Sequence, residues 1–164
     1  MRTGILCLLI APLLSGPAHA LSTDRNQPMD VEADRAQIDD ARGVSVYRGN
    51  VLIVQGSLRL TADELTLHTR DGTIIKAIAT GGPATYRQRP DGKDQDVVAE
   101  ALKLEYFADQ QRLILTDQAS IRQAGDSFRS QRIDYDIGAD VVKAGASSPK
   151  DRVRITIQPK TGSR

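Results

Sequence analysis

The sequence is poor in cysteine and in aromatic residues. Among 164 residues there is one cysteine, no tryptophan, and an aromatic fraction of 4%. A single cysteine excludes a disulfide framework within the chain, and with only two histidines it argues against a structural zinc site. The formal net charge of +1 and the scarcity of rings for base stacking argue against nucleic-acid binding. After the first twenty residues, no apolar run is long enough for a transmembrane helix.

The first twenty residues have the order of a secretory signal peptide. Arg2 is followed by an apolar run from Ile5 to Leu14, then by Gly16-Pro17 and the small-residue segment ending in Ala20. We therefore expect a signal peptide at 1–20, cleaved after Ala20, and one domain at 21–164. The exported chain would carry 21 basic and 21 acidic residues and no cysteine.

From Met29 onward the apolar residues alternate with polar ones. Leu58, Leu60 and Ala62, for example, alternate with polar neighbours, as expected for half-buried strands. Glycine-containing turn signals separate these runs, often at intervals near ten residues, and no window keeps a helical apolar stripe. The sequence predicts an all-β fold, an antiparallel sandwich or roll.

A short pattern recurs four times: a small residue, a polar residue, any residue, and two apolar residues separated by one. Within each copy, the alternation of inward-facing and outward-facing residues is shifted by one residue. This shift predicts a bulge or corner where the strand bends and continues in the facing sheet. The pattern therefore predicts stacked antiparallel hairpin units that cover one another. The copies are 33–38, 62–67, 99–104 and 130–135.

The sequence offers little for catalysis. His68 follows Leu67 at a polar, outward position of the alternation. The sequence has no G-x-S-x-G motif that would supply a nucleophilic serine for this histidine. Carboxylate pairs such as Asp94 with Asp96 and Asp134 with Asp136 are of the kind that a glycosidase or a calcium site uses, but they lie at a turn and on an outward parity. We interpret them as solvated charge. No catalytic residue, metal site or cofactor is predicted, and the protein is expected not to be an enzyme.

The inward positions are aliphatic, and the layer between two sheets is about 10 Å wide. Such a layer is either a well-filled core or a slot for an elongated apolar ligand, and composition alone favours the core. Charge is also uneven along the chain: residues 21–40 hold six acidic and two basic residues, whereas 141–164 hold six basic and one acidic. This asymmetry reflects either end-to-end association of copies through open sheet edges or two unrelated solvated patches.

Several short motifs, in their order and spacing, resemble the OstA-like family of lipopolysaccharide-transport proteins. Within that family, the cleavable signal favours a periplasmic member over the membrane-anchored LptC, and the length excludes the LptD barrel. One departure is Asp117-Gln118, where the family pattern has a second Gly-Asn, so this turn is expected to differ in type. The motifs lie at 27–34, 47–51, 55–56, 60–63, 82–85 and 115–119.

The resemblance implies a twisted, open-ended β-jelly roll with an apolar interior that binds the acyl chains of lipid A in the periplasm. It implies that LptC contacts the N-terminal edge, that the N-terminal domain of LptD contacts the C-terminal edge, and that copies join end to end. The lipid-contacting positions it implies are Met29, Val31, Tyr86, Leu104 and Tyr106.

We add a hypothesis that Arg87 and Arg89 contact lipid A phosphates, because arginine binds phosphate in a bidentate manner. A carbohydrate-binding jelly-roll module and a structural assembly protein of the envelope remain the alternatives.

Overall fold

The computed structural model describes residues 23–90, 92–145 and 152–159. The predicted signal peptide at 1–20 lies outside them. The predicted all-β fold is confirmed: apart from one short 3₁₀ turn, the described elements are strands. They are η1 (Thr23–Asn26), β1 (Asp30–Glu32), β2 (Arg35–Asp39), β3 (Val44–Gln55), β4 (Leu58–Arg70), β5 (Thr73–Gln88), β6 (Val97–Phe107), β7 (Arg112–Gln123), β8 (Asp126–Asp136), β9 (Val141–Gly145) and β10 (Arg154–Thr156).

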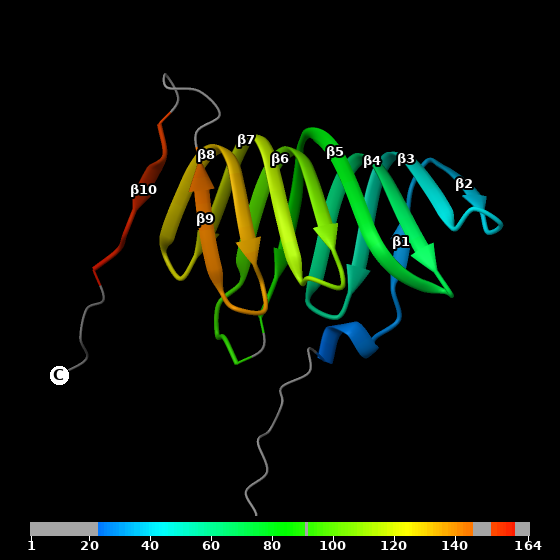
Figure 1. Ribbon diagram of the computed structural model, residues 1–164, viewed down its shortest axis with the longest axis horizontal. Helices are drawn as coiled ribbons and strands as arrows, with labels where there is room; N and C mark the ends of the chain where they lie inside the picture. The colour runs from blue at the N-terminus through cyan, green and yellow to red at the C-terminus, as the bar shows by residue number, and fades with distance from the viewer. Residues whose placement is uncertain (1–22, 91, 146–151, 160–164) are drawn as a thin grey trace, which may run out of the picture.

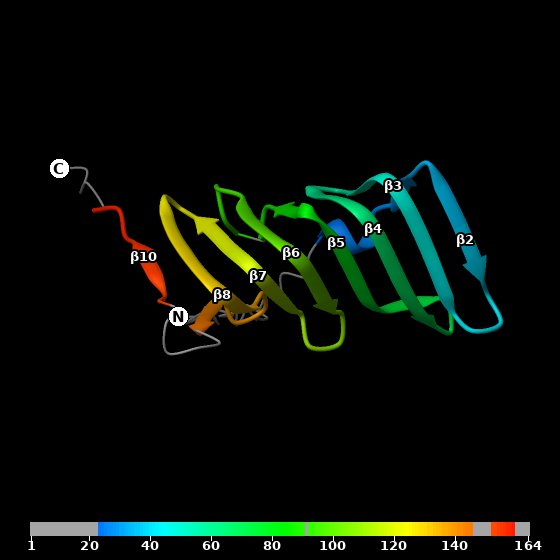
Figure 2. The same cartoon turned by 90° about the horizontal axis from the view of Figure 1, so that it is seen from above.

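The strands form a single antiparallel sheet in which β3 to β8 follow one another in chain order. At one end β1 and β2 both pair with β3, and at the other end β9 and β10 both pair with β8. Figure 2 shows the strands side by side along the long axis of the molecule. Because each strand pairs with its neighbours in sequence, short hairpin turns suffice to connect most of them.

The sheet is bent along a line of register shifts that crosses β3 to β8. The strand pairing is interrupted between Arg48 and Val51 in β3, between Thr80 and Ala84 in β5, and between Thr116 and Ala119 in β7. A β-bulge places extra residues on one strand of a pair, which bends that strand. The predicted corner is therefore confirmed, and it recurs on neighbouring strands at the same level of the sheet.

This bend divides the sheet into two facing walls, which meet along the bend line at the top of Figure 1 and end in hairpin turns at the bottom. We call the side with the turns the mouth. The front wall comprises residues 35–39, 44–48, 64–80, 103–116 and 132–145. The back wall comprises residues 30–32, 51–62, 84–90, 92–101, 119–130 and 154–156.

Small residues occupy the inside of the bend, and among them Ala62 is the small residue of a copy of the repeated pattern. Ala62, Ala84, Ala101 and Ala119 each flank a register shift, and all four are buried. In the third copy of the pattern, the small residue Ala99 does not lie at the bend. The shift lies between Glu100 and Lys103, so Ala101 takes this place, and Ala99 is an ordinary inward residue of the back wall.

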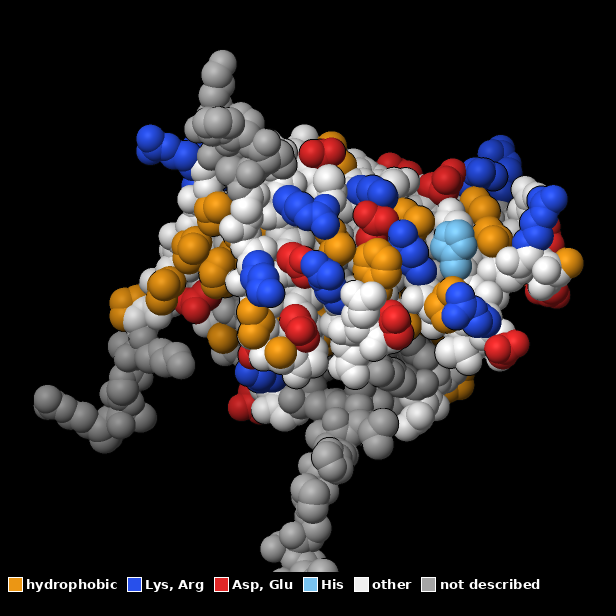
Figure 3. All heavy atoms as spheres, in the orientation of Figure 1, with side chains coloured by type: hydrophobic (Ala, Val, Ile, Leu, Met, Phe, Trp, Pro, Cys, Tyr) orange, Lys and Arg blue, Asp and Glu red, His pale blue; other side chains and the backbone are white. Residues whose placement is uncertain are grey.

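The core lies between the walls and takes alternate residues from both. Leu65, Leu115 and Ile133 of the front wall and Ile121 of the back wall are completely buried. The outward side of the front wall mixes basic, acidic and hydrophobic side chains (Figure 3). Each wall therefore has one face toward its partner and one toward solvent, which explains the period of two in the sequence.

Two other details differ from expectation. The first copy of the pattern places Ile38 inward, but its side chain is 60% exposed, because β2 is an end strand and no further strand covers it. The sequence also predicts that Asp117 and Gln118 form a different turn from Gly49-Asn50. Both pairs instead have positive φ at both residues, so the two bulges share a left-handed conformation.

Candidate functional site

The five residues expected to contact lipid all point into the layer between the walls. Leu104 and Tyr86 are 1% and 5% exposed and belong to the core cluster. Met29, Val31 and Tyr106 are partly buried and pack against that cluster. Met29, Val31 and Tyr86 come from the back-wall side, and the other two come from the front wall. The fold therefore brings together residues that are far apart in the sequence.

The register shows how these side chains share the layer. Leu104 lies between Ala79 and Leu115 on its neighbouring strands, and Tyr106 lies next to Leu113. On the opposite wall, Tyr86 is flanked by Leu60 and Ala99, as the strand pairing shows. Apolar inward residues of the two walls together form the core between them.

The hydroxyl of Tyr86 is part of a polar chain at the edge of the back wall. It donates to Oε1 of Gln88, and Nε2 of Gln88 donates to Oδ2 of Asp24 in η1 at 2.9 Å. Asp24 also accepts from the backbone N–H of Ser57 at 2.9 Å. Burial raises the pKa of the Asp24 carboxyl, but the hydrogen bonds from Ser57 and Gln88 outweigh it, so the pKa is lowered. The chain anchors η1 beside the apolar layer.

The layer is filled by its own side chains in this conformation. The inward residues of both walls form one continuous cluster of buried residues. Two hollows on the described residues, of about 420 and 290 Å³, are lined mainly by polar side chains of the outer surface. Tyrosine and leucine side chains of both walls are among those that fill the layer.

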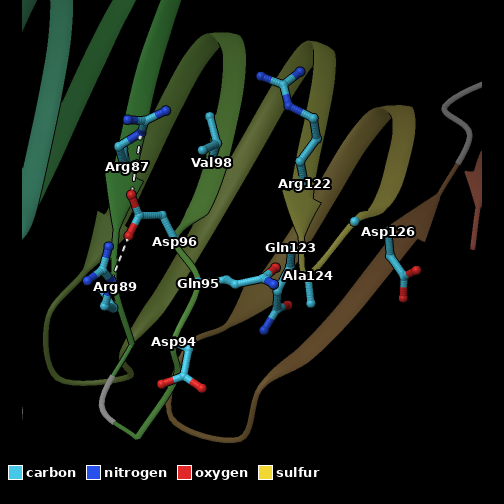
Figure 4. A pocket seen from close by; sticks show the side chains of 11 residues that line it. Arg87, Arg89, Asp94, Gln95, Asp96, Val98, Arg122, Gln123, Ala124 and Asp126 are labelled. Carbon is cyan, nitrogen blue, oxygen red and sulfur yellow. Dashed lines mark hydrogen bonds and ion pairs between the residues drawn. The ribbon is translucent and has the colours of Figure 1, made fainter. Parts of the chain in front are cut away.

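Arg87 and Arg89 lie on the outer side of the back wall, beside the larger hollow (Figure 4). The Nε atom of Arg89 is 2.9 Å from Oδ1 of Asp96, and the Nε atom of Arg87 is 3.8 Å from Oδ2 of the same carboxylate. Arg122 lies on the opposite side of this hollow and pairs with Glu100 at 2.8 Å. The two arginines are thus brought together with an acidic partner, and an anion would have to compete with Asp96.

Asp140 makes a set of contacts that the sequence reasoning missed. It lies in the β8–β9 turn of the front wall and accepts from Lys93 Nζ at 2.7 Å, from Gln123 Nε2 at 2.7 Å and from the hydroxyl of Tyr135 at 3.2 Å. The hydrogen bond from Lys93 is the main reason that the pKa of Asp140 is lowered. Burial, together with the charge of Asp140, raises the pKa of the Tyr135 hydroxyl. Lys93 and Gln123 belong to the back wall, so these contacts join the two walls.

One member of each of the two carboxylate pairs named in the sequence contacts an arginine. Asp96 contacts Arg89, and Asp134 accepts a hydrogen bond from Nε of Arg112 at 2.6 Å. They are therefore partly shielded members of ion pairs rather than freely solvated charges. His68 is half-buried on the outward side of β4. Within the described ranges, no group of three metal-ligating side chains is found, and no helix is long and apolar enough to cross a membrane.

Exposed large hydrophobic side chains gather at the two ends of the sheet. Ile38 lies in β2 at one end, Val141 and Ile155 lie in β9 and β10 at the other, and Ile157 follows β10. These end strands pair on one side only. Their outer edges therefore offer unpaired backbone groups beside apolar side chains, which is the chemistry of strand addition.

Comparison with known proteins identifies relatives of this chain. Residues 30–141 match the family described as LptA/(LptD N-terminal domain) LPS transport protein. The chain is 42% identical over 160 residues to the lipopolysaccharide export system protein LptH of Pseudomonas aeruginosa, covering 93% of this chain and 91% of LptH. It is 27% identical over 145 residues to LptA of Escherichia coli K12, covering 87% of this chain and 77% of LptA.

A solved structure agrees with the sequence comparison. The crystal structure of LptH, described as the LptA homologous periplasmic component of the lipopolysaccharide transport device of Pseudomonas aeruginosa, superposes with a TM-score of 0.76 at 39% identity. The match covers 83% of this chain and 99% of that chain. The expected roll is thereby confirmed, and so is a non-enzymatic role in lipopolysaccharide transport. The chain belongs to the LptA/LptD N-terminal domain family of lipopolysaccharide transport proteins.

Proposed function

We propose that this protein is a periplasmic carrier that holds the acyl chains of lipid A between its two walls. In this proposal it receives lipopolysaccharide from LptC at its N-terminal edge and passes it to the N-terminal domain of LptD at its C-terminal edge, as one of several copies joined end to end. The sugar and phosphates of the ligand stay in solvent at the mouth. Binding is the whole activity, and no bond is made or broken.

The observation that carries the proposal is the continuous apolar lining of both walls, from Val31 at one end to Tyr135 at the other. An acyl chain that leaves water for this layer gains roughly 0.8 kcal/mol per buried CH₂ group. Because the lining is continuous along the stacked strands, neighbouring positions offer similar environments. A lipid can then move along the roll without a large change in free energy.

The walls can part because of how they are joined. Backbone hydrogen bonds link the strands within each wall and across the bend, whereas the mouth side has hairpin turns. Opening the mouth therefore separates side chains but breaks no strand pairing. When the walls separate, the acyl chain takes the place of the opposite wall in packing against Leu104.

The two ends of the sheet support the bridging part of the proposal. The N-terminal edge strand β1 carries the exposed residues Asp30 and Glu32, and the C-terminal edge strand β10 carries the exposed Arg154. Antiparallel or parallel addition of β10 to β1 would bring these opposite charges together beside the exposed Ile155. The predicted signal peptide supports export to the periplasm.

Separate binding measurements with lipid A and with the core oligosaccharide, the two parts of lipopolysaccharide, test this function. The mature chain is expected to bind lipid A and to have no measurable affinity for core oligosaccharide without acyl chains, as measured by titration calorimetry. Tyr106→Ala should weaken lipid A binding because it removes apolar surface from the layer, whereas His68→Ala on the outward side should leave it unchanged. Binding of the oligosaccharide alone would instead indicate a carbohydrate-binding module, and binding of neither would indicate a structural assembly protein.

A further inference from the structure

A polar cluster holds the mouth closed toward the C-terminal end of the roll. We call Asp140, Lys93, Gln123 and Tyr135 the rim clasp. Asp140 belongs to the front wall, while Lys93 lies in the β5–β6 loop and Gln123 ends β7, both on the back wall. The clasp therefore joins the turns of one wall to those of the other, on the side opposite the bend.

The clasp sits directly over the apolar layer. Tyr135 is 1% exposed and belongs to the core cluster, yet its hydroxyl donates to Asp140 at the surface. This side chain thus links the surface ion pair to the packed interior. Any separation of the walls at this place must move Asp140 away from Lys93 and Gln123.

The ion pair of the clasp is accessible to solvent. The side chain of Lys93 is 47% exposed and that of Asp140 is 36% exposed. Ion pairs this open contribute little to stability, because water and salt compete with them. A competing anion can therefore release Lys93 at small cost, and the mouth is closed by a contact that a ligand is able to replace.

The cations near the mouth differ in how they are paired. Arg87 and Arg89 pair with Asp96, which belongs to the same wall. Lys93 instead pairs across the mouth with Asp140. If an anion binds Lys93, the two walls lose their ion pair, whereas an anion on Arg89 leaves the contact between the walls intact.

We propose that Asp140 is a latch that a phosphate group opens: the phosphate of an amphiphilic lipid replaces the Asp140 carboxylate on Lys93, and the walls part to admit its acyl chains. Lys93 is then a phosphate-binding residue at the mouth. This inference rests on the proposed function, because it describes how the same ligand enters. Lysine acts here as a point charge, so it can exchange one anionic partner for another without a fixed geometry.

The variants Asp140→Asn and Lys93→Met test the latch in the mature protein. Asparagine keeps the size of Asp140, tolerates its positive φ and still accepts from Gln123 and Tyr135, but it loses the charge that holds Lys93. Asp140→Asn is expected to bind bisphosphorylated lipid A about two- to fivefold more tightly than the wild type. Lys93→Met also frees the mouth, but it should no longer bind bisphosphorylated lipid A better than lipid A from which the phosphates have been removed.

The control is Asp109→Ala, which removes an exposed carboxylate from another front-wall turn, where it accepts the backbone N–H of the adjacent Gln110. It is expected to bind both lipids as the wild type does. Spin labels on Asp94→Cys and Ala139→Cys, at exposed positions on opposite sides of the mouth, should report a longer distance in Asp140→Asn and in the wild type with lipid A.

The outcomes separate the two proposals. If the wild type binds lipid A but Asp140→Asn matches Asp109→Ala in affinity and in label distance, the latch is wrong and the proposed function stands. If the wild type binds neither form of lipid A, the proposed function itself is wrong, and the latch with it. Circular dichroism of each variant shows whether the fold is kept before affinities are compared.

Discussion

Leu115→Ala is expected to lower the free energy of unfolding by about 2–5 kcal/mol, as measured by urea denaturation. Leu115 is completely buried and lies between Leu104 and Ile133 on its neighbouring strands. Removing its side chain leaves a cavity in the middle of the apolar layer, because the strands on both sides are fixed by backbone hydrogen bonds. The matched control is Ile38→Ala at the exposed sheet end, which should change stability by no more than about 0.5 kcal/mol.

The same variant carries information about the ligand. Saturating lipid A binds the folded state and stabilises it. If acyl chains occupy the layer, they fill part of the cavity at Leu115, so lipid A should raise the stability of the variant by more than that of the wild type. An equal gain in both proteins would mean that the lipid binds somewhere else, and a destabilisation no greater than that of Ile38→Ala would contradict the assigned core.

Ala101→Leu is expected to destabilise the protein by about 1–3 kcal/mol. Ala101 is completely buried on the inside of the bend, where it faces Ala84 on the neighbouring strand. Added methylene groups have no space there, because the two walls converge on the bend line. Thermal unfolding of this variant is best compared with that of Ala36→Leu, the same change at an exposed position of β2, which should be nearly neutral. A neutral Ala101→Leu would show that the bend does not require small residues.

The sequence was sufficient for the fold because its main signal is local. The alternation of apolar residues indicates which side of a strand faces the core. The one-residue shift of this alternation after Ala62 indicates where the strand bends. The sequence does not locate the bend in β6, because all residues from 97 to 102 except Glu100 are apolar. Inward and outward positions therefore look alike there, and the point at which the alternation shifts by one residue is not unique. The alternation of residues also places Ile38 on the inner side of its strand. It does not indicate, however, whether another strand covers that side chain.

The site was predictable in part. Met29 and Val31 lie at inward positions of the alternation and pack against the core, whereas Tyr86, Leu104 and Tyr106 are expected only from the family resemblance. The contacts at the mouth have no such signal. Asp140 and Lys93 are 47 residues apart and lie in turns, where no periodicity constrains the direction of a side chain. Whether the layer is filled or open likewise depends on how two walls interdigitate, which composition alone does not determine.

The central claim is that acyl chains lie between the walls, and site-specific photo-crosslinking tests it most directly. A photoreactive residue is placed in turn at Met29, Tyr86 and Tyr106, which face the layer, and at His68, which faces outward from the front wall. We expect lipopolysaccharide adducts at the three inner positions and none at His68. Adducts at His68 with none at the inner positions would contradict the claim.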